Sequence, residues 1–286
     1  MQWSDRRRRF RAVLAGDRCV HPGSVFDPIS ARIAEDLGFE IGMFAGSIAS
    51  FTVLGAPDLI VLTLTEFAAQ AARICRAGTL PLLVDADHGY GNALSVMRTV
   101  QELEAAGVAA LTIEDTDLPQ RFGETRQRLI PLQAAVGKMR AAVAARRDAD
   151  LVLFARTSAA AIAGVEEAVV RVRAYAETGV DGIFLVGLKT RAELETITAG
   201  VRLPIVLGGA GGELSDRHYL ASRGVRIALQ GHQPFMAAVQ AVHDTLKALR
   251  EGASPSQLRG IAGPELMRQV TREADYRRWM TDFLGG

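Results

Sequence analysis

The sequence predicts an α/β fold, a (β/α)8 TIM-type barrel with an N-terminal helix and a C-terminal helical extension. Short apolar runs alternate with longer amphipathic segments, and the chain contains eight such pairs. Eight strand–helix units are the number that closes this barrel. The length of 286 residues, with 49% hydrophobic and 23% charged residues, suits one soluble domain over residues 1–286.

The apolar runs have the length of buried strands. We expect strands at 19–26, 40–45, 80–85, 109–114, 151–155, 182–186, 204–207 and 225–229. The segments between them have helical periodicity. We expect helices at 29–37, 65–76, 93–106, 132–146, 165–178, 191–199, 216–222 and 234–250. Residues from about 252 to 286 have no barrel position left and form the extension, which packs outside or reaches a neighbouring subunit.

Glycines mark the ends of several expected helices, just before the next strand. They are Gly38, Gly107, Gly179 and Gly224. Glycine at this point ends helices in the left-handed conformation. A doubly wound open sheet is the alternative fold, but it requires a glycine-rich fingerprint after the first strand. Residues 27–30 read Asp-Pro-Ile-Ser instead.

A cluster of arginines at 6–9, with Arg11, lies near the N-terminus. A nucleic-acid-binding arm is one interpretation. The segment has helix periodicity, however, which favours the solvated face of a helix capped by Ser4 or Asp5. The formal net charge of +1 gives no argument for binding nucleic acid or an anionic membrane.

Cys19 and Cys75 are the only cysteines, which is too few for a disulfide framework and lacks metal-ligand spacing. No apolar run has the length of a membrane span, and the N-terminus lacks the apolar core of a signal peptide. We therefore expect a cytoplasmic protein with no membrane partner.

The run from Asp85 to Gly91 is the most informative stretch of the chain. Asp85 and Asp87 follow a buried strand, and the alternation of side chains along a strand points them the same way. Two adjacent anions repel each other, and a hard divalent cation with oxygen ligands offsets that repulsion. The pair therefore predicts a metal site.

Other polar residues follow the remaining strands: Ser47, Asp58, Glu114, Arg156 and His232. The carboxyl ends of barrel strands form the active site. These residues therefore fit Mg²⁺ or Mn²⁺ with an anionic substrate held opposite. Structural alternatives stay open for three of them: Asp58 as a turn residue, Glu114 as a helix cap and Arg156 as a salt-bridge partner.

Other site chemistries find less support. His88 has no second well-placed histidine for a hydrolase zinc site, and no G-x-S-x-G elbow is present. Residues 208–212 are glycine-rich and follow strand seven, where many barrels bind phosphate. They fit either a phosphate site or a flexible turn.

Taken together, the motifs resemble the phosphoenolpyruvate mutase/isocitrate lyase superfamily over nearly the whole chain. The motifs are Gly46-Ser47, Pro57-Asp58, the run 85–92, the run 112–115 and the run 155–157. Within this superfamily, the run from Asp85 together with Gly231-His232 is most similar to the bacterial oxaloacetate decarboxylase branch.

The resemblance implies a role for each residue of the metal site. Asp85 is expected to bind Mg²⁺ directly, with Mn²⁺ as an alternative. Asp58, Asp87 and Glu114 are expected to hold the metal's water ligands. The implied catalytic residues are Asp85, Arg156 and His232.

The resemblance also implies the substrate contacts and the assembly. Ser47 and neighbouring backbone amides bind the substrate carboxylate and keto oxygen, Arg156 binds a carboxylate, and His232 contacts the opposite side. The implied assembly is a homodimer or a homotetramer built as a dimer of dimers, with a C-terminal helix exchanged between subunits.

Two departures from the superfamily pattern bear on the reaction. Its lyases carry a catalytic cysteine in the loop after strand four, whereas residues 120–124 here read Gln-Arg-Phe-Gly-Glu. Ser158 stands where Asn or Asp is usual. The resemblance therefore implies Mg²⁺-dependent decarboxylation of oxaloacetate to pyruvate and CO2. The alternatives are a C–C or C–P lyase or hydrolase on another small 2-keto or 2-hydroxy acid, such as methylisocitrate or phosphonopyruvate, and a non-catalytic barrel.

Overall fold

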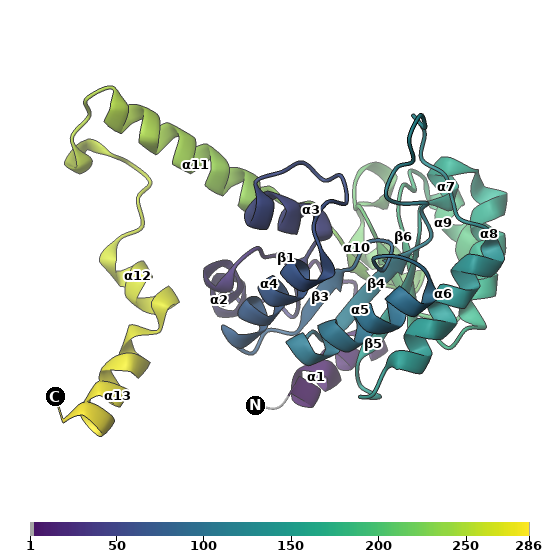
Figure 1. Cartoon of the computed structure of the whole chain (residues 1–286), viewed down its shortest axis with the longest axis horizontal. Coiled ribbons are helices and arrows are strands. Elements are labelled where there is room, and N and C mark those ends of the chain that lie inside the picture. Colours follow the sequence, from purple (N-terminus) through teal and green to yellow (C-terminus); the bar gives the residue numbers. More distant parts are fainter. Residues whose placement is uncertain (1–2, 286) are drawn as a thin grey trace. The chain divides into compact units, whose positions relative to one another are not determined.

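A computed structural model describes residues 3–285, and across these residues eight parallel strands follow one another in sequence order (Figure 1). The strands are β1 (Gly23–Ser24), β2 (Gly42–Phe44), β3 (Leu82–Asp85), β4 (Ala110–Glu114), β5 (Val152–Thr157), β6 (Gly182–Leu185), β7 (Ile205–Leu207) and β8 (Val225–Ala228). A parallel bridge between Val20 and Ile227 joins the segment before β1 to β8 and closes the barrel. The predicted (β/α)8 fold is confirmed.

In the barrel unit one helix precedes the first strand and the others follow strands in the sequence. They are α1 (Trp3–Ala15), α2 (Pro28–Asp36), α3 (Gly46–Ala49), α4 (Leu64–Arg76), α5 (Ala93–Ala106), α6 (Leu132–Ala145), α7 (Ala159–Ile162), α8 (Val165–Ala176), α9 (Arg191–Thr198) and α10 (Arg217–Ser222), with a π-helical turn η1 (Ser50–Leu54) and a 3-10 turn η2 (Gly212–Leu214). The expected strands and helices are present to within a few residues at their ends. Short α3, η1 and α7 were not expected from the sequence.

The glycines at the helix ends adopt the expected conformation. Their φ angles are 81°, 91°, 91° and 81° for Gly38, Gly107, Gly179 and Gly224. This left-handed region is open to glycine at little cost, so each helix can end and the chain can turn into the next strand. The glycine-terminated helices read from the sequence are therefore confirmed.

Helix α1 contacts the barrel through Arg6 and Arg7, which are only 6% and 4% exposed. Arg6 donates hydrogen bonds to the backbone carbonyls of Cys75, in the last turn of α4, and of Gly78, just after α4. Arg7 donates from Nε to the carbonyl of Val108, at 3.1 Å. The expected solvated arginine face is thus wrong for these two residues, because their guanidinium groups satisfy carbonyls at helix C-termini.

The expected cap of α1 is also wrong. Ser4 and Asp5 lie inside the helix rather than before it. The Ser4 hydroxyl donates instead to the Asp148 carboxylate at 2.7 Å, and Arg7 forms an ion pair with the same carboxylate. Ser4 therefore makes a long-range contact, and Asp5 pairs with Arg8 one turn further along the same helix, so neither serves as a cap.

The chain forms two compact units, one ending at Gly231 and one beginning at His232. The second unit contains α11 (Gln233–Arg250), a 3-10 turn η3 (Pro255–Gln257), α12 (Pro264–Thr271) and α13 (Glu273–Leu284). The sequence analysis began the C-terminal extension at about residue 252, whereas α11 belongs to this unit. No helix within residues 3–285 is long and apolar enough to cross a bilayer.

Helix α11 carries an exposed apolar stripe along one face. Its side chains are between 39% and 61% exposed: Met236, Val239, Val242, Leu246 and Leu249. Residues three or four apart lie on one face of a helix. A contiguous apolar face of this kind marks an interaction surface.

Candidate active site

Two buried acids and an arginine meet at the carboxyl ends of β3, β4 and β5. Asp85 and Glu114 are the last residues of their strands and are 8% and 4% exposed. Arg156 lies opposite Glu114 in the β4–β5 register and donates a hydrogen bond to Asp85. Its Nη2 is 3.3 Å from Glu114 Oε2. The salt-bridge reading of Arg156 is confirmed, and Glu114 caps no helix because it belongs to β4.

Asp87 reaches the same site by a different route from the one expected. It lies beyond the end of β3 and has a φ of 48°, so strand alternation does not set its direction. Its backbone N–H is 3.3 Å from Asp85 Oδ1. A Cβ atom added to Gly46 would lie 2.4 Å from Asp87 Oδ2, so the start of α3 packs directly on this carboxylate.

Burial and repulsion between carboxylates raise the pKa of three acids at this site. Burial raises the pKa of Asp87 well above its usual value, and Asp85, Glu114 and Asp58 add to the shift. Burial also raises the pKa of Asp58 and of Glu114, with repulsion from Asp85 contributing to both. Burial lowers the pKa of Arg156, but attraction to Asp85 and Glu114 outweighs it and the net shift is upward. The charged forms of these acids are therefore disfavoured in a site that contains one arginine, and a bound cation would favour them.

The donor set suits a hard divalent cation, which prefers carboxylate oxygens and water. Within residues 3–285, no three acidic, histidine or cysteine side chains lie close enough together to hold a metal directly. An arrangement with Asp85 as the one inner ligand and three acids acting through water does not require such a group. The residues thus fit the metal site that the resemblance implies.

Two threonines that the sequence analysis did not single out orient the acids. Thr112 Oγ1 donates to Asp85 Oδ1 at 2.8 Å, and Thr116 Oγ1 donates to Glu114 Oε2 at 3.1 Å. Thr112 lies two residues before Glu114 and pairs with Asp85 in the β3–β4 register. Side-chain alternation along β4 would have placed it on the site face.

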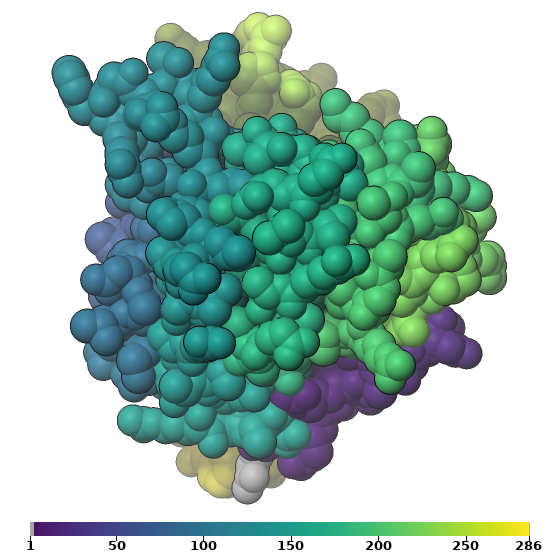
Figure 2. Space-filling view, turned by 90° about the vertical axis from the view of Figure 1, so that its right-hand side faces the viewer, coloured from purple at the N-terminus to yellow at the C-terminus, as the bar shows by residue number. Residues whose placement is uncertain are grey.

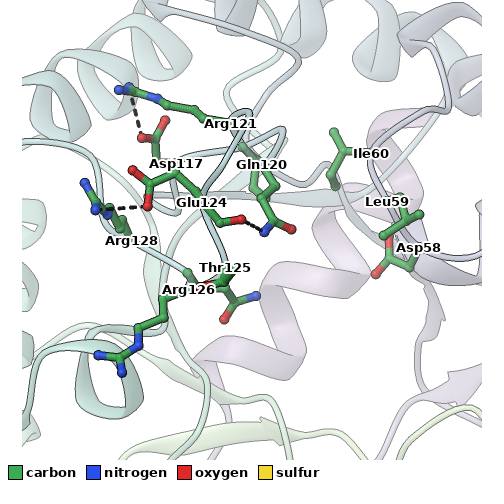
Figure 3. Close-up of a pocket in the computed structure, with 12 residues that line it drawn as sticks. Asp58, Leu59, Ile60, Asp117, Gln120, Arg121, Glu124, Thr125, Arg126 and Arg128 are labelled. Carbon is green, nitrogen blue, oxygen red and sulfur yellow. Dashed lines mark hydrogen bonds and ion pairs between the residues drawn. The ribbon is translucent and has the colours of Figure 1, made fainter.

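A pocket lies between the segment from Asp58 to Ile60 and the loop at 117–128, as Figure 3 shows. Ion pairs of 2.9 Å join Arg121 to Asp117 and Arg128 to Glu124 within the loop. Figure 2 shows this teal segment projecting at the upper left of the molecule. Asp58 therefore sits where the acid site meets a concave opening.

Backbone strain is concentrated beside the acids. Ile60, Asp87 and Tyr90 have φ angles of 58°, 48° and 58°, in a region that side chains other than glycine rarely adopt. Ile60 is β-branched, for which this conformation is the most unfavourable. Strained residues of this kind cluster at functional sites, where the surrounding structure holds them in place.

The remaining candidates are placed as follows. Ser47 lies in the first turn of α3 and is partly exposed. His232 precedes α11 as the first residue of the second unit, and its part in the site stays a prediction. Gly208, Gly209 and Gly211 line an open hollow that also includes Lys189, and a phosphate role for it likewise stays a prediction.

His88 is buried and uncharged at neutral pH. Burial, followed by the nearby Lys138, lowers the pKa of His88 to about 4. Lys138 Nζ on α6 donates to the His88 backbone carbonyl at 2.8 Å and so fixes the turn after β3. The low weight that the sequence gave His88 as a metal ligand stays a prediction.

Comparison with known proteins identifies what the chain is similar to. A sequence model of the family described as phosphoenolpyruvate phosphomutase matches residues 10–250. A relative from Bradyrhizobium diazoefficiens named oxaloacetate decarboxylase is 58% identical over 285 residues, covering 100% of this chain and 99% of the relative. A relative of the same name from Rhodopseudomonas palustris is also 58% identical over 285 residues, with the same coverage.

Solved structures share the fold over their whole length. Oxaloacetate acetylhydrolase in complex with 3,3-difluorooxalacetate has a TM-score of 0.86 at 28% identity and covers 99% of this chain and 98% of its own. Phosphonopyruvate hydrolase in complex with oxalate and Mg²⁺ has a TM-score of 0.85 at 28% identity, with coverage of 98% and 99%.

Proposed function

The chain belongs to the phosphoenolpyruvate phosphomutase family, and we propose that it decarboxylates oxaloacetate to pyruvate and CO2. The family match confirms the resemblance drawn from the motifs. One observation carries the proposal: the buried Asp85–Arg156–Glu114 arrangement stands in a chain 58% identical, over its whole length, to relatives named oxaloacetate decarboxylase.

We propose Mg²⁺ as the metal, with Mn²⁺ as its substitute. Asp85 would hold it directly, and Asp58, Asp87 and Glu114 would hold its waters. The raised pKa of Asp87 and of Glu114 supports this assignment, because a bound cation would favour their charged forms. When bound, the metal supplies Lewis-acid polarisation of a substrate oxygen.

The protein's own residues bind and orient the substrate. Arg156 would bind a carboxylate of the 2-keto acid, because its guanidinium already lies among the acids of the site. Ser47 would donate its hydroxyl toward the keto oxygen, where negative charge develops as CO2 leaves. Holding the C3–carboxylate bond perpendicular to the plane of the forming enolate lowers the barrier to its cleavage.

The enolate left by loss of CO2 takes a proton from water. No protein acid is required for this step, which accords with the absence of a cysteine from residues 120–124. Both cysteines of the chain, Cys19 and Cys75, are buried elsewhere in the barrel unit. A lyase that depends on a loop thiol is therefore less well supported.

The proposal is tested by mixing the purified protein and Mg²⁺ with oxaloacetate, methylisocitrate and phosphonopyruvate. Loss of enol absorbance and formation of pyruvate are followed, with Mg²⁺ alone as the blank. We expect fast loss of oxaloacetate and little turnover of the others. Loss of oxaloacetate no faster than in the blank would exclude the proposed activity.

Replacing His232 by glutamine is expected to reduce oxaloacetate turnover by about tenfold to a hundredfold while leaving metal affinity within twofold. The reason is that His232 is proposed to contact substrate rather than metal. Initial rates and titration with Mn²⁺, followed by its EPR signal, measure the two quantities. An equal loss of both would assign His232 to the metal instead.

A second candidate is hydrolysis or lysis of another small 2-keto acid. The structural similarity to oxaloacetate acetylhydrolase and phosphonopyruvate hydrolase favours it. Product analysis separates the alternatives, because acetylhydrolase chemistry releases oxalate and acetate instead of pyruvate and CO2. A non-catalytic barrel is less well supported, since it has no use for three buried acids beside one arginine.

We also propose that the protein is a homodimer or a dimer of dimers in which the second unit contacts another subunit. The exposed stripe of α11 supports this. Replacing Leu246, which is 61% exposed, by glutamate should lower the oligomer mass measured by light scattering. Arg250→Glu at the end of the same helix is the control, and an unchanged mass for Leu246→Glu would contradict the proposal.

A further inference from the structure

A buried cluster lies on the outer side of β4 and β5, behind the acid site. Asp115 is fully buried, and its Oδ2 accepts hydrogen bonds from Thr157 at 2.8 Å, Tyr175 at 2.5 Å and Arg171 at 3.1 Å. Tyr175 and Arg171 belong to α8 and are 0% and 4% exposed. Burial raises the pKa of Tyr175, with Asp115 adding to the shift, so its hydroxyl stays a proton donor.

The members of this cluster are chain neighbours of the site residues. Asp115 directly follows Glu114, and Thr157 directly follows Arg156. Glu114 and Arg156 are partners in the β4–β5 register. Thr157 is the last residue of β5, so its side chain points to the face opposite that of Arg156. Its hydrogen bond to Asp115, just beyond β4, places the cluster on the outer side of the strand ends that form the site.

The same cluster anchors the base of the loop at 117–128. The backbone N–H of Ile130 donates to the carbonyl of Asp115 at 2.9 Å, and Arg171 Nη2 donates to the carbonyl of Ile130 at 3.0 Å. A bridge between Thr116 and Leu129 continues this closure. The Asp115 carboxylate therefore joins the end of β5 and α8, while the Asp115 carbonyl and Arg171 hold the loop base.

Stability alone gives a weak account of this arrangement. Buried ion pairs contribute little to stability compared with well-packed apolar residues, because both charges lose their hydration. In addition, Asp115 Oδ1 is buried with no hydrogen-bond partner among the described residues. Directional hydrogen bonds do, however, fix the rotation of a strand end more narrowly than apolar packing does.

We propose that Asp115, Thr157, Arg171 and Tyr175 are positioning residues that set the orientation of Glu114 and Arg156 for the metal and the substrate. This inference rests on the proposed function for its kinetic consequence. Its structural consequence, a preformed metal site, does not depend on the substrate. A hydroxyl on α8 thus acts on the site through two strand ends, without touching a reacting atom.

The test is the variant Tyr175→Phe, which removes one hydroxyl and keeps the ring. We expect kcat/KM for oxaloacetate to fall about tenfold and the Kd for Mn²⁺, measured by EPR, to rise about threefold to tenfold. Raising the Mg²⁺ concentration should recover part of the activity, because part of the defect lies in Glu114. Thr157→Val, nearly isosteric, should act in the same direction.

Leu194→Ala is the matched control, because Leu194 is fully buried on α9 and its apolar side chain can form no hydrogen bond to β4 or β5. It should lower the melting temperature at least as much as Tyr175→Phe while leaving kcat/KM and the Mn²⁺ affinity within twofold. Equal kinetic and metal-binding defects in the two variants would overturn the proposal and make the cluster ordinary core.

Coupling to Arg156 gives an independent readout. If Tyr175 acts through Arg156 and Glu114, replacing Tyr175 by phenylalanine should reduce kcat/KM much less in an Arg156→Lys background than in the natural protein. Fully additive losses of kcat/KM would contradict the positioning role.

Two outcomes separate this inference from the proposed function. If the natural protein is inactive on oxaloacetate and Tyr175→Phe still lowers the Mn²⁺ affinity, only the proposed function is refuted. An active protein with unchanged Mn²⁺ affinity and kinetics in Tyr175→Phe would refute only the positioning role.

Discussion

Replacing Asp85 by alanine should lower kcat for oxaloacetate by roughly a thousandfold or more, equivalent to about 4 kcal/mol of transition-state stabilisation. Asp85 is the proposed inner metal ligand, and the other acids act through water. The melting temperature should change by only a few degrees, because removing Asp85 also relieves its repulsion of Asp58 and Asp87. Initial rates and thermal denaturation measure the two effects.

Asp181→Asn is the matched control for Asp85→Ala. Asp181 is also a partly buried acid at a strand, but it pairs with Arg11 at 2.9 Å and accepts from the backbone N–H of Leu153 at 2.9 Å, away from the site acids. Its replacement should cost about 1–3 kcal/mol of stability and leave kcat nearly unchanged. The proposed metal role would be refuted if Asp85→Ala retained the activity of the natural protein.

Replacing Arg156 by methionine is expected to reduce kcat/KM by about a hundredfold to a thousandfold, because the substrate loses its carboxylate partner. Arg156→Lys should recover only part of the loss, since an ammonium group cannot bridge two partners as a planar guanidinium does. Steady-state kinetics with oxaloacetate measure both variants. A methionine variant with an unchanged KM and kcat would remove Arg156 from the mechanism.

The same methionine variant should have a stability that depends on pH. Burial and mutual repulsion already raise the pKa of Asp87 above 3.8 and of Glu114 above 4.5, and Arg156 opposes both shifts. Without Arg156 the folded state holds these protons still more tightly than the unfolded chain. The free energy of unfolding should therefore be highest below about pH 4, and it should decrease as the pH rises toward the folded-state pKa values. Chemical denaturation across this range, with Mg²⁺ absent and present, measures the effect.

The fold could be predicted from the sequence because each strand–helix unit repeats the same local signals. The alternation of apolar runs with amphipathic segments and the glycines at 38, 107, 179 and 224 suffice to count eight units. The burial of Arg6 and Arg7 could not be predicted, because their partners are carbonyls far along the chain. A pattern of charged residues predicts exposure correctly only when no group far along the sequence pairs with those charges.

The candidate site was predictable in its residue types but less so in its geometry. The rule that barrel sites form at the carboxyl ends of strands correctly brought Glu114 and Arg156 together. Strand alternation failed for Asp87, whose left-handed backbone lies beyond the strand. The cluster around Asp115 was invisible because Tyr175 and Arg171 lie on a helix, four residues apart, with no motif to mark them. Such outward-facing support is a tertiary property that local patterns do not encode.

Because Gly46 packs against Asp87, the residue at one of these positions restricts which residues can evolve at the other. Any side chain at position 46 would occupy the space of the Asp87 carboxylate, so the glycine cannot vary while the acid remains. Loss of the acid would in turn free position 46 to accept larger residues. A descendant that abandons the metal is thus expected to reveal it by a substitution at position 46.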